Sequence, residues 1–157
     1  MRLGKFALMH QEESDPEEST PRRFDVELFI VHPTLDPAEI TAALGLEGHH
    51  TQRVGDGRQT PKGTLLSGKH PDMRWRHSVR YEIGDQWFAE AVTKLVDRLV
   101  PHKAFLGSLR STSGEICVII QFLGDGHFGD KLPSDTLAKL VDMGLDLGIE
   151  CFDVPQS

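Results

Sequence analysis

The stretch MRWRHSVRYEI, residues 73–83, has the clearest alternating pattern in the chain. Apolar or ring-bearing side chains stand at every second position, and arginine, serine and glutamate fill the positions between them. A period of two is typical of a β-strand with one face in a core. We therefore predict a strand whose other face, bearing Arg74, Arg76 and Arg80, is open to water or to a ligand.

The same alternation occurs in residues 24–30, 116–122 and 147–151, and residues 49–54 suit a brief strand. Residues 55–71, rich in Gly, Pro, Lys and Thr, are interpreted as a loop.

Helix signals lie between these strands. Asp36 is a predicted N-cap, with Pro37 in the first turn, Glu39 completing a capping box and Gly45 as the stop.

Two more helical regions follow the strand at residues 73–83. Asp85 is the expected cap of the first, which ends before Pro101 and continues in a shorter piece at residues 103–110. The second begins at residue 134 or 135 and ends at Gly144. We expect its inward residues to be Leu137, Leu140 and Val141.

The resulting order is βαββαβαβ. Helices with a single apolar stripe and strands that alternate favour an α+β fold, with helices on one face of an antiparallel or mixed sheet. We expect a ferredoxin-like arrangement with one added strand.

The order of motifs resembles a bacterial family catalogued as domain of unknown function 4279, over about residues 24–154. The matching positions are Asp36, Pro37, Gly45, Leu46, Arg53, Gly55, Asp56 and Trp75. The resemblance implies a small α+β bacterial domain, with no established reaction, cofactor or catalytic residue to transfer. Toxin–immunity gene neighbourhoods have been suggested for similar small domains, which makes an immunity-like role one hypothesis.

The chain has 157 residues, 38% of them hydrophobic, and a formal net charge of −7. This size fits a single α+β domain, predicted at residues 24–157, after a mobile acidic extension at residues 1–23. The negative charge disfavours nucleic acid and anionic lipid as partners. With no signal-peptide pattern and no apolar run of roughly 20 residues, we expect a cytoplasmic protein without membrane contact.

Basic residues gather in one part of this acidic chain. Residues 47–80 hold seven Lys or Arg side chains against three Asp or Glu. A local anion or partner site is one interpretation, because guanidinium groups bind carboxylate and phosphate through paired hydrogen bonds. Its candidate residues are Arg53, Arg58, Lys62, Arg74, Arg76 and Arg80. The alternative is that these side chains pair with Glu82, Glu115 or Glu150 and only keep an open sheet face in solution.

Other chemistry lacks a signal. The eight histidines and two cysteines show no zinc-ligand spacing, so we predict no metal site and no cofactor. Cys117 and Cys151 are expected to be reduced and on opposite sides of the sheet. His77 suits a hydrogen-bonded position in the core. No motif supplies a catalytic residue, so an enzyme is the less favoured class.

Two hypotheses follow. The first is a binding module whose open sheet face contacts a partner protein or a second copy of the chain. In an immunity-like version, the acidic residues of segment 115–153 would attract a basic nuclease. The second is a sensor or enzyme for a small anionic ligand, bound between residues 55–71 and the strand bearing Arg74 and Arg80. An Arg76→Glu change should abolish binding in either case and leave the melting temperature nearly unchanged.

Overall fold

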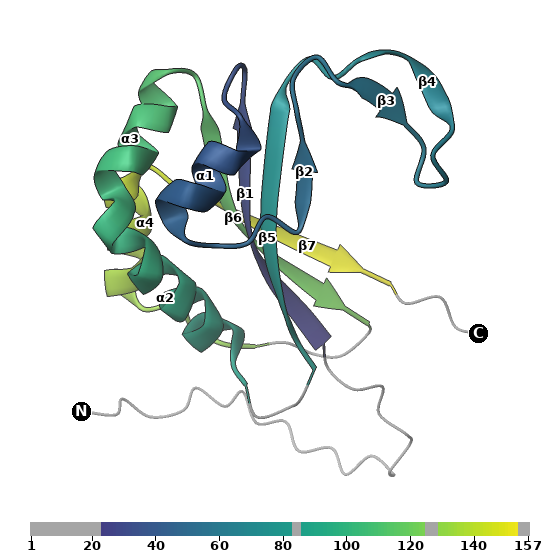
Figure 1. Ribbon diagram of the computed structural model, residues 1–157. Coiled ribbons are helices and arrows are strands. Elements are labelled where there is room, and N and C mark those ends of the chain that lie inside the picture. Colours follow the sequence, from purple (N-terminus) through teal and green to yellow (C-terminus); the bar gives the residue numbers. More distant parts are fainter. Residues whose placement is uncertain (1–22, 83–85, 125–128, 154–157) are drawn as a thin grey trace.

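The chain folds around a central strand that has a neighbour on each side. The structure, a computed structural model, describes residues 23–82, 86–124 and 129–153. Its main sheet has five strands in the order β2-β5-β1-β6-β7 (Figure 1). Their bounds are β1 (Arg23–His32), β2 (His50–Gln52), β5 (Met73–Tyr81), β6 (Glu115–Leu123) and β7 (Asp146–Phe152).

Strand directions show that the sheet is mixed. β1 is antiparallel to both β5 and β6, and β2 is antiparallel to β5. β6 and β7 are parallel, as expected when a helix connects two adjacent strands. The short strands β3 (Gly57–Gln59) and β4 (Leu65–Lys69) form a separate two-stranded hairpin.

The helices lie together on one face of the sheet (Figure 1). They are α1 (Pro37–Leu44), α2 (Phe88–Leu99), the 3-10 turn η1 (Val100–His102), α3 (Lys103–Ser111) and α4 (Ser134–Met143). None of the described helices is long and apolar enough to cross a membrane.

The core lies between the sheet and these helices. Trp75 is fully buried there, and its Nε1–H donates to Thr41 Oγ1 at 3.0 Å, which joins β5 to α1. Gly48 passes so close that a Cβ would lie 2.4 Å from Trp75 Nε1. Only glycine fits beside the indole at this approach.

The first predicted helix is confirmed in detail. Asp36 accepts the Ala38 N–H and Glu39 accepts the Asp36 N–H, which completes the capping box. Gly45 ends the helix in the left-handed region, with φ of 65°.

The α+β class with a mixed sheet is confirmed, but the ferredoxin-like strand order is not. That arrangement is a split βαβ unit, in which strands joined through a helix run parallel. Here β1 is antiparallel to both of its neighbours, and the parallel pair is β6 with β7.

Residues 55–71 were interpreted as a loop, and that prediction is wrong because the segment contains the β3–β4 hairpin. Backbone hydrogen bonds close its base between Gly55 and His70 and between His70 and Asp56, at 2.9 Å each. At its tip, Gly63 has a φ of 84°, a conformation that glycine adopts at little cost. The hairpin therefore depends on its own backbone pairing rather than on an alternating apolar pattern.

The predicted inward face of α4 is partly wrong. Leu140 is buried, but Leu137 and Val141 are exposed, and Thr136 and Met143 take the buried positions. The helix is rotated because it packs against α2 as well as the sheet, and Thr136 hydrogen-bonds Thr93 of α2 at 2.8 Å.

Some predictions fall outside the described residues. These are the proposed cap Asp85, the last strand residue Ile83, and the acidic extension up to residue 22. Arg23, assigned to that extension, is instead the first residue of β1.

Candidate functional site

One face of the main sheet carries none of the described helices, and we call it the open face (Figure 1). Strand register defines its residues, because partners across a sheet point to the same side. The side chains on it include Arg74, Arg76, Ser78, Arg80, Asp25, Glu27, Phe29, Cys117, Ile119, Gln121, Asp146, Glu150 and Phe152.

Two acidic side chains lie at the centre of the open face. Asp25 is 6% exposed and Glu27 is 5% exposed, although no helix covers them. Both belong to β1, so the strands on either side supply their shielding side chains. Buried carboxylates are stable only when they are paired or protonated, so their partners decide what this surface can bind.

Arg80 is the partner of Asp25. The two residues stand directly opposite each other on β5 and β1. Arg80 Nε and Nη2 donate to the two Asp25 oxygens at 2.9 and 3.0 Å, the paired geometry that a guanidinium forms with a carboxylate. The hydrogen bonds with Asp25 raise the pKa of Arg80.

Arg76 is the partner of Glu27. Its Nη1 lies 3.3 Å from Glu27 Oε2, and its guanidinium carbon lies 4.6 Å from the centre of the Phe29 ring. Burial raises the pKa of Glu27, while Arg76 and a hydrogen bond with Ser78 act in the opposite direction. Arg76 thus compensates a buried charge and packs on an aromatic ring at once.

Arg74 has a partner at the edge of the sheet. Its Nε donates to Asp72 Oδ1 at 3.0 Å. The amide of Gln52 on β2 donates to the same Asp72 carboxylate, also at 3.0 Å. The three arginines of β5 are therefore each paired with a carboxylate of the chain itself.

The carboxylates named in the solubilising alternative are not the ones that pair with these arginines. Glu82, Glu115 and Glu150 were expected, whereas Asp72, Glu27 and Asp25 supply the contacts. Glu150 instead accepts a hydrogen bond from Gln121 at 2.7 Å. Sequence alone does not show that β1 lies beside β5, so Glu27 and Asp25 were not expected as the partners of Arg76 and Arg80. Asp72, by contrast, lies only two residues before Arg74.

Arg53 does not join the arginines of β5. It forms an ion pair with Asp36, the N-cap of α1. Two of the motif positions that carried the family resemblance thus contact each other, and Trp75 and Leu46 are core residues. These positions stabilise the fold where β2 leads into the hairpin.

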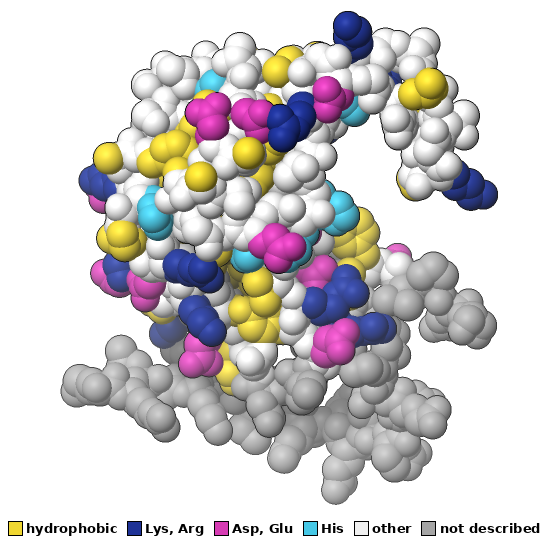
Figure 2. All heavy atoms as spheres, viewed as in Figure 1, with side chains coloured by type: hydrophobic (Ala, Val, Ile, Leu, Met, Phe, Trp, Pro, Cys, Tyr) yellow, Lys and Arg dark blue, Asp and Glu magenta, His cyan; other side chains and the backbone are white. Residues whose placement is uncertain are grey.

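Arg58 and Lys62 lie in the hairpin segment, residues 55–70, which we call the arm. The arm extends on the side of the sheet away from the helices, and Figure 2 shows a notch between it and the rest of the molecule. Both of its strands are exposed along their whole length, and Leu65 is 73% exposed. Within the described residues, neither Arg58 nor Lys62 forms an ion pair.

The six predicted site residues therefore lie at three separate places in the structure. Arg74, Arg76 and Arg80 share the open face, Arg58 and Lys62 belong to the arm, and Arg53 is next to α1. Sequence reasoning missed Asp25 and Glu27 as parts of the site, although their alternation with apolar residues in strand β1 placed both on one face. It also missed Leu65 and Leu66, because exposed leucines in a loop carry no periodic signal.

The predictions for His77 and Cys117 concern a buried hydrogen bond, thiol reactivity and metal binding rather than anion binding. The predicted hydrogen bond of His77 is present, since its Nδ1–H donates to the Glu47 carbonyl oxygen at 2.7 Å. The predicted core position is wrong, because His77 is only half-buried. Burial lowers the pKa of His77. Burial and the nearby Asp146 raise the pKa of Cys117, which keeps its thiol protonated and poorly nucleophilic. Among the described residues, no three His, Cys, Asp or Glu side chains form a metal-binding group.

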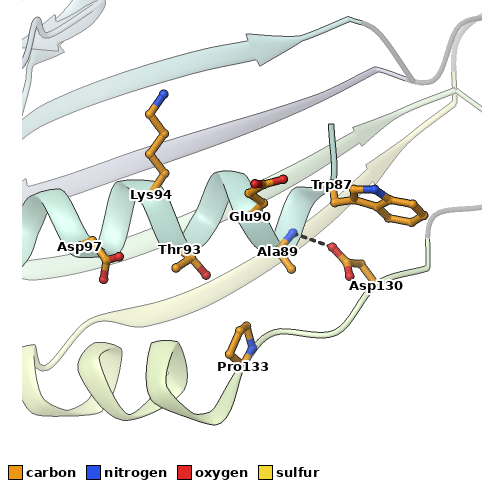
Figure 3. A pocket seen from close by; sticks show the side chains of 8 residues that line it. All are labelled: Trp87, Ala89, Glu90, Thr93, Lys94, Asp97, Asp130 and Pro133. Atoms are coloured by element: carbon orange, nitrogen blue, oxygen red, sulfur yellow. Dashed lines mark hydrogen bonds between the residues drawn. The ribbon is translucent and has the colours of Figure 1, made fainter. Parts of the chain in front are cut away.

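A shallow hollow lies on the helix side, between α2 and the segment that leads into α4 (Figure 3). Asp130 accepts the Ala89 N–H at 3.0 Å and so caps α2 from another part of the chain. Trp87 and Glu90 also line this hollow, but none of the six predicted site residues does. The predicted ligand pocket is therefore not this one.

Fold and site together describe an α+β domain with one uncovered sheet face and a projecting basic hairpin. The chain belongs to the family described as Domain of unknown function (DUF4279), whose model matches residues 22–153. No curated protein and no solved structure matches the chain significantly.

Proposed function

We propose that this chain is a protein-binding module that holds its partner between the open face and the arm. The observation that carries the proposal is the arm itself, an exposed hairpin that extends from the sheet on its uncovered side (Figure 1). A hairpin without a core of its own gains little from folding alone. Its role is better explained by contacts that it makes with another molecule.

Side-chain chemistry favours a protein as that partner. The arm presents Leu65 and Leu66 beside Arg58 and Lys62, and the open face presents Phe152, which is also exposed. Apolar and arginine side chains in one patch are enriched at the centres of protein interfaces. A small polar ligand would leave these apolar side chains in water.

The β6–β7 part of the open face suits a basic region of the partner. Glu115, Asp146 and Glu150 are exposed there, and Glu150 accepts a hydrogen bond from Gln121. Opposite charge would increase the rate of encounter with a basic protein. This arrangement supports the immunity-like version of the proposal, in which the chain blocks a nuclease whose basic region meets β6–β7 and whose acidic region meets the arm.

Site-specific photocrosslinking in cells of the source organism tests the proposal. A photoreactive side chain replaces Leu65 on the arm or Phe152 on the open face, and Val100, also exposed but between α2 and α3, is the matched control. We expect the first two probes to capture the same protein and the Val100 probe not to capture it. Capture of a protein by Val100 alone, or no adduct from either test position, would contradict the proposal.

A second experiment tests the role of charge. Lys62→Glu and Lys69→Glu reverse exposed charges of the arm, neither of which forms an ion pair within the described residues. The crosslinked product should fall several-fold while the melting temperature stays the same, because neither side chain supports the fold. An undiminished product would mean that the arm charges have no part in binding.

One observation favours the second candidate, a small anionic ligand. The arm cations Arg58, Lys62 and Lys69 lie in one short hairpin and are unpaired within the described residues. Inorganic phosphate can serve as the probe, because a ligand that binds only the folded chain stabilises it by an amount that grows with the logarithm of the ligand concentration above Kd. Stabilisation by phosphate that is lost in Arg58→Glu would support this candidate, and stabilisation that is equal in both proteins would oppose it.

A further inference from the structure

The outer flank of α4 is unusual for a helix at the surface, because it carries no charge. The helix has three charged side chains, and each is paired toward α2, toward α3 or within the helix. Lys139 Nζ lies 2.9 Å from Asp97 of α2 and 2.7 Å from Asp135, and Asp142 accepts a hydrogen bond from Lys103 of α3 at 2.7 Å. The opposite flank faces away from both helices.

Leu137 and Val141 occupy that flank, one helical turn apart. Val141 is 80% exposed, the most of any large hydrophobic side chain in the described part of the chain. Ser134 and Ala138, the other residues of this flank by helical spacing, are small and uncharged. Exposed apolar side chains mark a contact surface when they form part of a larger contiguous apolar patch.

The neighbouring strand continues the apolar surface. β7 is the edge of the main sheet and pairs only with β6 among the described strands. Leu147, Ile149 and Cys151 alternate on its helix-side face, and Ile149 is 65% exposed. An unpaired edge strand beside apolar side chains is a ready site for addition of another strand.

We propose that a second copy of the chain covers this surface, with β7 paired to β7 of the other copy in an antiparallel, two-fold arrangement. The two sheets would become continuous, and the α4 flanks bearing Leu137 and Val141 would meet above the joint. The apolar side chains of this surface, Leu137 and Val141 of α4 and Ile149 of β7, lie on the helix side and not on the open face, so the inference does not rest on the proposed function.

Charge determines the register of this pairing. With Ile149 opposite its own copy, Leu147 faces Cys151, and all pairs on the helix side are apolar. On the other side Asp146 faces Phe152 and Gly148 faces Glu150, so no acid stands opposite an acid. Two neighbouring registers also keep the helices of both copies on the same side of the joined sheet. One of them places Asp146 opposite Glu150 of the other copy, and the other places Glu150 opposite Glu150 of the other copy.

The same charges explain why the occupant is another copy. The chain has a net charge of −7, so most of its surface repels a second molecule of the same kind. The α4 flank and the helix side of β7 avoid this repulsion, since their exposed side chains are uncharged. A two-fold contact brings identical patches together, and this patch is complementary to itself.

Sedimentation equilibrium of the full chain, with and without one substitution, tests the inference. We expect the wild-type chain to have twice the mass of one chain at micromolar concentration, and Val141→Lys to weaken association at least tenfold. Leu65→Lys, the same kind of change on the exposed arm, is the matched control and should leave the mass unchanged. A wild-type monomer, or a Val141→Lys dimer as tight as wild type, would overturn the inference.

Disulfide crosslinking tests the register. In a chain whose two native cysteines are serines, Ile149→Cys should form a disulfide dimer on oxidation, because antiparallel partners bring their Cα atoms within the required distance. Glu150→Cys, one residue away and on the other face, should not. Efficient crosslinking through position 150, or none through position 149, would refute the proposed pairing.

Discussion

The β5 strand and the arm both carry basic side chains that the sequence pattern predicts to be exposed, but the two sets differ in their ion pairing. On β5, Arg76 and Arg80 are paired with the buried carboxylates Glu27 and Asp25. On the arm, Arg58 and Lys62 extend from a hairpin with no core and have no ion pair among the described residues. Whether a basic side chain stabilises the fold or stays available for binding therefore depends on its place in the structure and not on its residue type.

The difference has a physical reason. A carboxylate that is 5 or 6% exposed loses most of its hydration, so a cation beside it reduces a large penalty. A cation in water gains almost nothing from a distant charge, because the solvent screens it. Substitutions in the two regions should therefore have very different effects on stability.

The largest effect is expected for Arg76→Glu. The change would place a second carboxylate beside buried Glu27 and remove the contact with Phe29, so the free energy of unfolding should fall by about 3 kcal/mol or more. Urea denaturation measures this loss. The matched change Arg58→Glu on the arm should cost less than about 0.5 kcal/mol. The earlier expectation that Arg76→Glu leaves the melting temperature unchanged is thus replaced by a prediction of strong destabilisation.

The next effect concerns Arg80→Ala. It would leave both oxygens of Asp25 without their hydrogen bonds, at a cost of about 2 kcal/mol. Arg80 is itself half exposed, so water replaces part of the lost interaction and the cost stays below that of Arg76→Glu. Thermal unfolding can rank the two variants, and equal loss in both would show that the greater exposure of Arg80 does not reduce the effect.

A smaller, pH-dependent effect is expected for Glu27→Gln. Because burial raises the pKa of Glu27, the folded state binds its proton more readily than the unfolded chain. The ionised group therefore lowers stability above its folded-state pKa, and this penalty fades as the pH falls through that value. The difference in unfolding free energy, variant minus wild type, should become more positive between about pH 4 and pH 7. A difference that shrinks over this range would contradict the assignment.

The smallest effect on stability is expected on the arm. Lys62→Glu combined with Arg58→Glu should change the free energy of unfolding by less than about 0.5 kcal/mol, because neither side chain is buried. Any loss of partner capture in this variant would then reflect binding alone. A large loss of stability would show that the arm cations support the fold after all.

Local patterns in the sequence were enough for several elements. The α1 capping box depends on residues three positions apart, so Asp36 and Glu39 could be recognised without knowledge of the fold. Alternation correctly separated the core side of β5 from its arginine side. It also placed Cys117 and Cys151 on opposite sides of the sheet.

Predictions failed where the answer depends on which elements are neighbours. The buried face of α4 shifted to Thr136 because α2 packs beside it, and the β3–β4 hairpin formed without an apolar pattern. The expected ion-pair partners of Arg76 and Arg80 were wrong for the same reason, since strand order brings β1 beside β5.

The sequence by itself determined the α+β class, the faces of its strands, the first helix cap and the family to which the chain belongs. These features follow from the period of apolar residues and from contacts between residues close in the chain. Only the tertiary structure decided that Asp25 and Glu27 take up the β5 cations while the arm cations stay free. The reason is that burial and long-range charge pairing depend on the packing of segments more than fifty residues apart, such as Asp25 and Arg80.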